Sequence, residues 1–278
     1  MQAVTDSVEK IFGWVKGASR AVPGAKCAKR QLFLNYKGGT GKTSISAAYG
    51  YYLASTGKRV LMIDLDAQAH LTACFNQSGL RHDKSLYSVI VRGSRLSDII
   101  TRTDQPNLKI APSSISLSSA ELPLFRMPYR EFRLRRALKE VERDFDFIII
   151  DSAPNIGLLS LNAILASDDI LIPLLADFLS FHGLKILLET LTSIQRDFHF
   201  YLRKICVFLN RYNPEYSICA QCSEAIHKHY PGYALKAVIR ESHDIMDATS
   251  VGRSVFELDG ASAASCDIKE LVREVNGL

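Results

Sequence analysis

The sequence predicts an α/β protein with a single domain, in which helices flank both faces of a mostly parallel, twisted sheet. Apolar runs of strand length alternate with helical patterns along most of the chain. Some of these runs are continuous, as in strands that are buried on both faces of a parallel sheet. A glycine-rich segment, 37–44, joins the first such run to the first helical pattern. With 278 residues and 47% hydrophobic content, the chain is long enough to bury a large core.

Composition restricts the classes of protein that fit. No run approaches the roughly 18 apolar residues that a membrane span needs, and the N-terminus lacks the apolar region of a signal peptide. The six cysteines are scattered, which favours reduced thiols over a disulfide framework. The formal net charge of +5 permits nucleic-acid binding without requiring it. We therefore expect a cytosolic protein.

Residues 1–30 form an extension before a domain that spans 31–278. Val8, Ile11, Phe12 and Val15 have the spacing of one apolar stripe on a short helix, and a basic linker follows. The extension is either a helix that docks on its own domain, with a solvated linker, or a contact with DNA or a partner subunit.

A phosphate-binding loop is the strongest signal. It lies between a predicted strand, 31–36, and a predicted helix, 42–56. Glycines let the backbone wind tightly, so that N–H groups and the helix N-terminus point at anionic oxygens. Lys42 is expected at the β- and γ-phosphates and Thr43 at Mg²⁺. The candidate nucleotide-binding residues are Lys37, Gly38, Gly39, Thr40, Gly41, Lys42, Thr43 and Ser44.

Carboxylates follow a second predicted strand, 60–64. Asp64 and Asp66 stand where open α/β sheets bind ligands, and they point the same way if the strand continues. One of the two carboxylates can bind Mg²⁺ through a water molecule, and the other can orient the water that attacks the phosphate.

A third strand, 145–151, ends in Asp151, the position of a carboxylate in the second shell of Mg²⁺. Before it, helical patterns cover 85–91, 95–101, 116–122 and 129–143, and a strand covers 107–111. The arginines of 129–143 are expected on a solvated face.

The remaining pattern continues the alternation of strands and helices, which predicts parallel strands with right-handed crossovers. Asn210, at the end of a predicted strand, is a further candidate for nucleotide contact. The predicted helices are 157–166, 181–197, 217–229 and 267–275, and the predicted strands are 169–173, 204–210 and 235–239.

These motifs together resemble the ParA/MinD family of deviant Walker ATPases, closest to ParA. The loop 37–44 matches the family's form, whose mark is the extra lysine, here Lys37. Residues 64–72 are similar to its second motif, with Ala67 where a proline is usual, and 150–163 are similar to its Walker B stretch. The resemblance covers about residues 31–275 and thins between 73 and 105.

The resemblance implies an ATPase with ATP and Mg²⁺ as cofactors, slow and stimulated by a partner. Lys37, Lys42 and Asp66 would be catalytic, with Lys37 crossing to the partner's phosphates in an ATP-bound homodimer. Thr43, Asp64 and Asp151 would hold Mg²⁺, the two aspartates through water. Family members of the ParA type bind DNA without sequence preference, associate with the nucleoid, and respond to a ParB-like adaptor while positioning plasmids, chromosomes or other cargo. Candidate DNA contacts are Lys and Arg at 203, 204, 211, 228, 236 and 240.

Three alternatives remain open. A MinD-like, membrane-associated protein needs an amphipathic membrane helix, but 267–275 carries three acids, which leaves the N-terminal stripe as the better candidate. An iron–sulfur carrier of the Mrp group would use Cys219 and Cys222, although the pair falls in a helical pattern. A scaffold without turnover is disfavoured because all the nucleotide residues are present. The histidines, His70 among them, receive no role.

Overall fold

The computed structural model describes residues 27–75 and 84–278, and the apolar stripe of the predicted N-terminal extension lies outside these residues. The chain forms an eight-stranded sheet in the order β3-β4-β2-β5-β1-β6-β7-β8. Every strand pair is parallel except β3 with β4, which confirms the predicted fold class. The strands are β1 Lys29–Phe33, β2 Val60–Leu65, β3 Thr101–Arg102, β4 Leu108–Ala111, β5 Phe147–Ser152, β6 Asp169–Leu175, β7 Lys204–Tyr212 and β8 Ile239–Arg240.

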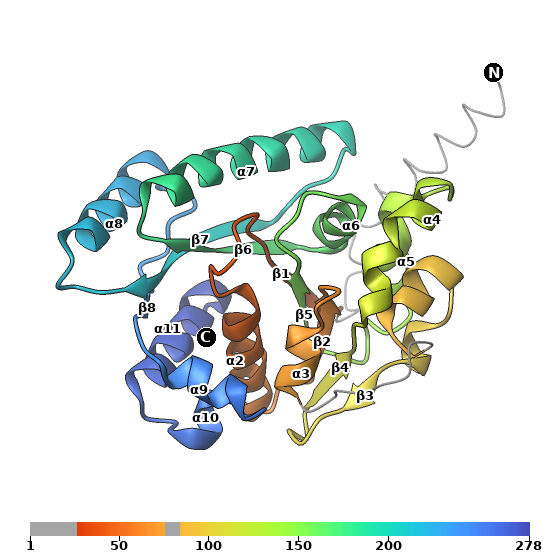
Figure 1. The fold of residues 1–278 in the computed structure, drawn as a ribbon, viewed down its shortest axis with the longest axis horizontal. Coiled ribbons are helices and arrows are strands. Elements are labelled where there is room, and N and C mark those ends of the chain that lie inside the picture. Colours follow the sequence, from red (N-terminus) through yellow and green to blue (C-terminus); the bar gives the residue numbers. More distant parts are fainter. Residues whose placement is uncertain (1–26, 76–83) are drawn as a thin grey trace.

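Helices cover both faces of the sheet (Figure 1). One layer contains α2, α9, α10 and α11, and the other contains α4 to α8. The helices are α2 Lys42–Ser55, α3 His70–Cys74, α4 Glu121–Phe125, α5 Arg133–Leu138, α6 Leu158–Ala166, α7 Phe178–Asp197, α8 Ser217–His229, α9 Asp244–Ser250, α10 Val255–Leu258 and α11 Ala263–Asn276. In the described residues, no helix is long and apolar enough to cross a membrane.

The central strands alternate between the two helical layers. In β1, Leu32 belongs to the core beneath α5 to α8, whereas Phe33 belongs to the core beneath α2 and α11. In β5, Ile148 and Ile150 face the first of these cores and Ile149 faces the second. Because successive side chains of a strand point to opposite faces, an unbroken apolar run is what a doubly covered strand requires.

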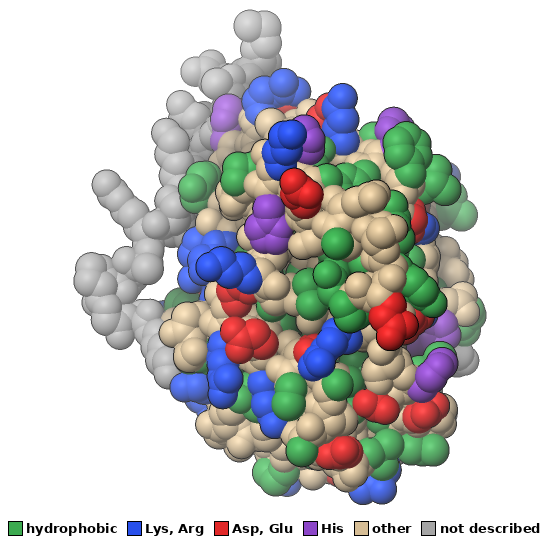
Figure 2. All heavy atoms as spheres, turned by 90° about the vertical axis from the view of Figure 1, so that its left-hand side faces the viewer, with side chains coloured by type: hydrophobic (Ala, Val, Ile, Leu, Met, Phe, Trp, Pro, Cys, Tyr) green, Lys and Arg blue, Asp and Glu red, His purple; other side chains and the backbone are tan. Residues whose placement is uncertain are grey.

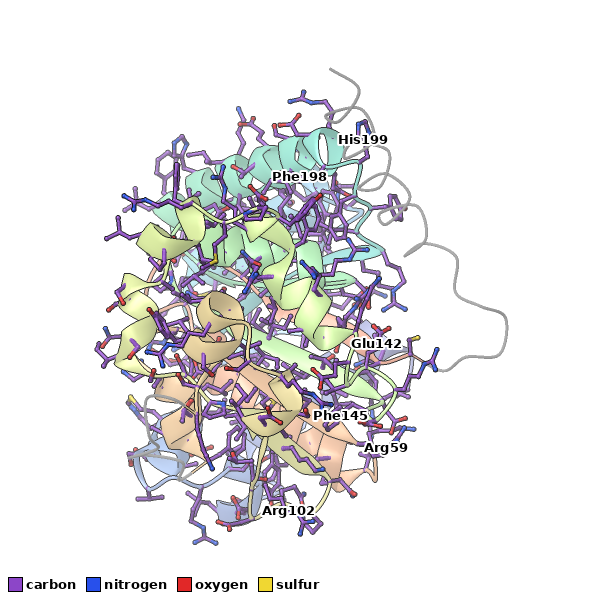
Figure 3. All side chains as sticks on the ribbon, turned by 90° about the vertical axis from the view of Figure 1, so that its right-hand side faces the viewer. Arg59, Arg102, Glu142, Phe145, Phe198 and His199 are labelled. Atoms are coloured by element: carbon purple, nitrogen blue, oxygen red, sulfur yellow. The ribbon has the colours of Figure 1, made fainter. Side chains whose placement is uncertain are left out.

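Ion pairs connect neighbouring strands at the edge of the sheet where the parallel strands begin. Arg30 donates to Asp168 at 2.7 Å, just before β6. Arg59 pairs with Asp146 at 3.3 Å, where β2 and β5 start. Figure 3 shows Phe145 and Arg59 close to each other at this edge. The nucleotide motifs follow the opposite ends of the strands, so this edge stays away from the site.

The predicted helix 129–143 is wrong in extent. Tyr129 has a positive φ of 55°, which interrupts a helix, and the chain forms a 3₁₀ turn, Arg130–Phe132, before the short α5. The expectation of a solvated basic face is wrong at Arg135, which is buried and lies over the ring of Phe200.

The predicted strand 235–239 is reduced to β8 and an isolated bridge between Val207 and Ala234. The backbone N–H groups of Lys236 and Ala237 donate to the carboxylate of Glu274 on α11, at 2.8 and 2.7 Å. A side chain therefore takes the place of ladder hydrogen bonds there.

The remaining differences between the predicted and the observed elements concern short segments. The pattern 85–91 is a π-helical turn, Ser88–Arg92, and 95–101 becomes a 3₁₀ turn, Leu96–Asp98, followed by β3. Helices α9 and α10 were not predicted, and α7 begins at Phe178, three residues earlier than expected.

Candidate nucleotide-binding site

A cleft of about 550 Å³ opens at the carboxyl ends of the central strands. Its size is that of an ordinary small-molecule site, and its position is where open α/β sheets bind ligands. The lining residues come from the phosphate loop, the segment after β2, the segment after β5 and the end of β7: Gly38, Gly39, Gly41, Lys42, Thr43, Ser44, Asp66, Gln68, His70, Ser152, Ala153, Pro154, Asn155 and Arg211.

The phosphate loop is held from beneath by Asn210. Its Nδ2 donates to the carbonyl of Thr40 at 2.9 Å. Gly41 caps α2 with φ +89°, and a Cβ there would collide with the same Nδ2, so both conformation and space require glycine. Asn210 is buried and supports the loop, and its contact with a nucleotide stays a prediction.

Lys42 is anchored inside the loop. It is buried, and its Nζ donates to the carbonyl of Lys37 at 3.2 Å. Burial lowers the pKa of the Lys42 ammonium, while the carboxylates of Asp151 and Asp66 oppose that shift. A cation held in this way is set in place for phosphate oxygens before they arrive.

Thr43 lines the cleft and Asp151 lies buried beneath it, and we call these two residues, with Lys42, the floor of the cleft. Thr43 Oγ1 donates to Asp151 Oδ2 at 2.7 Å, and Asp151 Oδ1 is buried without a hydrogen-bond partner. Burial, with the nearby Asp64, raises the pKa of the Asp151 carboxyl to about 8. A free carboxylate oxygen beside a hydroxyl is the donor set that Mg²⁺ prefers, so these two residues fit the predicted metal.

Asp64 is fully buried and is not part of the cleft lining. Its Oδ2 accepts from the N–H and the Oγ1 of Thr72, at 2.8 and 2.6 Å, and its Oδ1 accepts from the N–H of Asp66 at 3.1 Å. Burial raises the pKa of this carboxyl to about 6. Because β2 ends at Leu65, the condition for Asp64 and Asp66 to point the same way, a strand that continues through both, is not met. The role of Asp64 in holding magnesium through water stays a prediction.

Asp66 begins a tight turn at the outer edge of the cleft, which we call the rim. Its Oδ1 accepts from the N–H of Gln68 at 2.9 Å, and its carbonyl accepts from the N–H of Ala69. Ala69 has φ 54°, and this left-handed residue caps α3 and leads to His70, which lines the cleft. Asp66 lines the cleft together with residues of the phosphate loop, and its role in orienting water stays a prediction.

Lys37 lies outside the cleft lining. Its Nζ pairs with Asp177 Oδ2 at 2.8 Å and contacts Ser180 Oγ at 3.2 Å. Asp177 is also the N-cap of α7, accepting from the N–H of Ser180. Although burial opposes it, the hydrogen bonds from Lys37 and Ser180 lower the pKa of the Asp177 carboxyl. The two lysines of the loop therefore have different partners within one subunit.

Seven lining residues had no predicted role at the nucleotide, namely Gln68, His70, Ser152, Ala153, Pro154, Asn155 and Arg211. Arg211, which was considered only for DNA, has φ 53° at the irregularity between Asn210 and Tyr212, and this conformation turns it from the strand into the cleft. The positive φ has no sequence signal, because arginine rarely adopts it.

The cysteine pair is not arranged as a cluster site. Cys219 and Cys222 are both buried on α8, and Cys219 Sγ accepts from the N–H of Asn213. In the part of the chain that the structure describes, no three His, Cys, Asp or Glu side chains form a potential metal site. The geometry gives the iron–sulfur alternative no support.

Comparisons with known proteins identify the family. A family described as AAA domain matches residues 29–204. Cell division protein PomZ of Myxococcus xanthus is 42% identical over 89% of this chain and 77% of its own length. Sporulation initiation inhibitor protein Soj of Bacillus subtilis is 34% identical over 87% of this chain and 95% of its own length. The solved ATP complex of Cyanothece McdA has a TM-score of 0.83 at 25% identity, covering 91% of this chain and 98% of McdA. The chain therefore belongs to the ParA/MinD family of deviant Walker ATPases, among the ParA- and Soj-type partition and positioning ATPases.

Proposed function

We propose that this protein is an ATP-driven dimer switch that binds DNA without sequence preference and positions a cargo. ATP and Mg²⁺ bind in the cleft, two subunits close face to face, and a ParB-like adaptor stimulates slow hydrolysis. Relatives support the class, since their names state cell division for PomZ and chromosome partitioning for ParA of Caulobacter vibrioides. Within this proposal the protein acts in the cytoplasm, on the nucleoid.

The observation that carries the proposal is the separation of the two loop lysines. Lys42 is buried under the phosphate loop, whereas Lys37 is half-exposed and held by Asp177 at the start of α7. One subunit needs a single lysine to hold the phosphates. A second cation on the rim is suited to reach the nucleotide of a facing subunit, as a cation supplied in trans does in other phosphoryl transfers.

Each residue of the cleft has a separate task. N–H groups of the phosphate loop and the N-terminus of α2 bind phosphate oxygens, and Lys42 adds a fixed charge. Asp66 orients the attacking water from the rim. Thr43 and Asp151 would hold Mg²⁺, which neutralises charge on the phosphates when it is bound.

Apolar side chains beside the cleft support a face-to-face dimer. Phe178 and Leu179, which follow Asp177, are 82% and 70% exposed, and Ile156, after the cleft-lining segment, is 67% exposed. Large apolar side chains around a site are a usual sign of an interface. Closing two copies here would cover these residues and bring the rim lysines to the opposing clefts.

The DNA contact is assigned to the side of the molecule that carries α8 and β8. Figure 2 shows Lys and Arg side chains mainly on the left half and at the top of this face, with Asp and Glu side chains between them. Among the candidates, Arg240 is bound bidentately by Asp267, at 2.7 and 3.0 Å, so that it is positioned rather than free. Contacts with phosphates alone would make affinity fall steeply with salt.

The test measures assembly and turnover together. Light scattering after gel filtration should show a dimer with ATP and a monomer with ADP, and wild type should hydrolyse ATP faster when DNA and its adaptor are present. Lys37→Ala should bind ATP but fail in both measurements, while Lys185→Ala, an exposed change on α7, should behave as wild type. A wild-type protein that remains monomeric with ATP would overturn the switch.

A further inference from the structure

The Thr72 side chain joins two segments of the chain that follow neighbouring strands, β2 and β4. Thr72 lies on α3, is 3% exposed, and donates its hydroxyl proton to Asp64 Oδ2 at 2.6 Å. Thr72 Oγ1 also accepts from the backbone N–H of Ser113, just after β4, at 3.0 Å. A hydroxyl has one proton to donate and can accept as well, so this side chain uses both capacities. Serine is the other small residue that could make both bonds.

The carboxylate of Asp64 fastens the segment that leads from β2 to α3. It accepts from the N–H of Asp66 at 3.1 Å, from the N–H of Thr72 at 2.8 Å and from the Thr72 hydroxyl. Asp64 is fully buried, so donors from the chain must satisfy it in place of solvent. The turn that begins at Asp66 is therefore held at both ends by one carboxylate.

The segment after β4 gives this arrangement a fixed support. The carbonyl of Pro112 accepts from the N–H of Leu86 at 2.9 Å, and Ser113 is buried. Because β4 pairs with β2 in parallel, the segment lies beside α3 (Figure 1). Thr72 thus ties the Asp66 turn to a second buried part of the fold.

The residues between Asp66 and Thr72 have little stability of their own. Ala69 has φ 54°, a left-handed conformation that is unfavourable for a residue with a side chain. Helix α3 has five residues and no side-chain cap, and so short a helix is unstable in isolation. External hydrogen bonds must hold this conformation, and the bonds that link Asp64, Thr72 and Ser113 are buried, where such bonds are strongest.

We propose that Thr72 is a positioning residue for ATP hydrolysis. By holding the Asp64 carboxylate against the segment after β4, its hydroxyl fixes the turn that carries Asp66 at the rim. This inference rests on the proposed function, in which Asp66 orients the attacking water. Misplacement of such a group by about 1 Å can cost about 100-fold in rate. Thr72 is not part of the cleft lining, so ATP affinity should depend on it only weakly.

Two substitutions separate hydrogen bonding from packing. Thr72→Val keeps the branched shape of the side chain and loses the hydroxyl, whereas Thr72→Ser keeps the hydroxyl and loses the methyl group. The matched control is Thr192→Val, which removes a hydroxyl that donates to the carbonyl of Leu188 at 2.8 Å on α7. Calorimetry on each variant shows whether it is folded at the assay temperature. If Thr72→Val is not, Thr72→Cys replaces it, because a thiol is only a weak donor.

Hydrogen exchange of the full chain without nucleotide measures the turn directly. In Thr72→Val, amide exchange across residues 66–72 should rise at least about tenfold, because Asp64 Oδ2 loses a donor and the Ser113 N–H loses its acceptor. Thr72→Ser and Thr192→Val should exchange in this segment as wild type does. Unchanged exchange in Thr72→Val would overturn the proposal.

Single-turnover hydrolysis with saturating ATP and Mg²⁺ tests the link to the reaction. Thr72→Val should lower the rate by about 10- to 100-fold. Its ATP affinity should stay within about threefold of wild type, because a positioning residue acts on the reaction and not on ground-state binding. Thr72→Ser should restore most of the rate. In an Asp66→Asn background, Thr72→Val should have little further effect, since the residue that it positions is already disabled.

Three results would contradict the positioning role. Equal losses of ATP affinity and rate in Thr72→Val would make Thr72 a general structural residue. A rate loss that adds in full to that of Asp66→Asn would place its effect elsewhere, and failure of Thr72→Ser to restore the rate would assign the effect to packing. If wild type does not hydrolyse ATP, or Asp66→Asn hydrolyses it normally, the proposed function fails instead, and the exchange data still decide whether Thr72 fixes the turn.

Discussion

The floor and the rim of the cleft differ in how complete they are within one subunit. On the floor, hydrogen bonds tie Lys42, Thr43 and Asp151 into the chain before any ligand arrives, and Lys42 and Asp151 are also buried. On the rim, Lys37 is paired with Asp177 outside the cleft, and exposed Phe178 follows it. The floor is built for binding, whereas the rim has the form of a site that needs a second surface.

Because of this difference, we expect floor residues to determine the affinity for ATP and rim residues to determine the rate of hydrolysis. Groups that are already in place contribute binding energy at once, because little is lost in ordering them. A group that is paired elsewhere, as Lys37 is with Asp177, can act only after that ion pair has broken. Variants of the floor and of the rim should accordingly fail in different measurements.

The largest effect is expected on the floor. Lys42→Ala removes the fixed charge under the phosphates, and we expect ATP affinity to fall by at least about 100-fold, close to 3 kcal/mol. Isothermal titration with ATP and Mg²⁺ measures this change. Lys185→Ala is the control, since it removes an exposed lysine from α7. Retained affinity in Lys42→Ala would mean that the floor does not bind phosphates.

Lys37→Ala tests the rim directly. ATP affinity should stay within about threefold of wild type, because this lysine lies outside the cleft lining, while hydrolysis should fall by about 100-fold or more, as for other cations supplied in trans. Single-turnover hydrolysis and nucleotide titration on the same preparation give both numbers. Normal hydrolysis would contradict the difference between floor and rim.

The floor should also make stability depend on pH. Burial raises the pKa of Asp151 to about 8, whereas an aspartate of the unfolded chain titrates near 4. Between these values the folded protein keeps a proton that the unfolded chain has released, so its free energy of unfolding falls as pH rises. Without nucleotide, we expect a Tm higher by about 5 °C at pH 6 than at pH 8.5, measured by calorimetry.

Two variants sharpen that result. Asp151→Asn cannot ionise and should lose most of the pH dependence, while Asp104→Asn, at an exposed position, should keep it. Mg²⁺ with ATP should also flatten the profile, because a cation compensates the buried charge. An unchanged profile in Asp151→Asn would assign the effect to another group.

The smallest effect is expected from the pair that holds Lys37. Asp177→Asn weakens a half-exposed ion pair, and such pairs contribute at most about 1 kcal/mol. ATP-dependent dimerisation should therefore occur at an ATP concentration lower by only about two- to fivefold. Light scattering across an ATP titration detects this shift. Because Asp177 also caps α7, the thermal stability of the variant is the necessary control.

The fold was predictable where the sequence pattern is local. The apolar runs of β2 and β5 and the loop before α2 indicate their own structure, because burial on both faces and phosphate binding each demand particular neighbours. The short β3, α9 and α10 carry too few residues for a periodic signal. The strand expected at 235–239 failed because a distant carboxylate, that of Glu274, takes its N–H groups.

The site divides in the same way. The residues of the phosphate loop and Asp151 could be selected from motifs, and their roles stay predictions. The pairing of Lys37 with Asp177 could not, because it joins residues 140 positions apart. Nor could the turning of Arg211 into the cleft, which depends on a backbone conformation that its residue type does not favour.

The hydrogen bond from Asn210 to Thr40 has a thermodynamic consequence. Asn210 lies on β7, next to the edge proposed to meet DNA, and Thr40 lies in the phosphate loop. If DNA binds better to one arrangement of that edge, bound DNA changes the affinity for ATP by some factor. Thermodynamic linkage then requires that bound ATP change the affinity for DNA by the same factor. The coupling free energy would then be the same whether it is measured with ATP or with DNA.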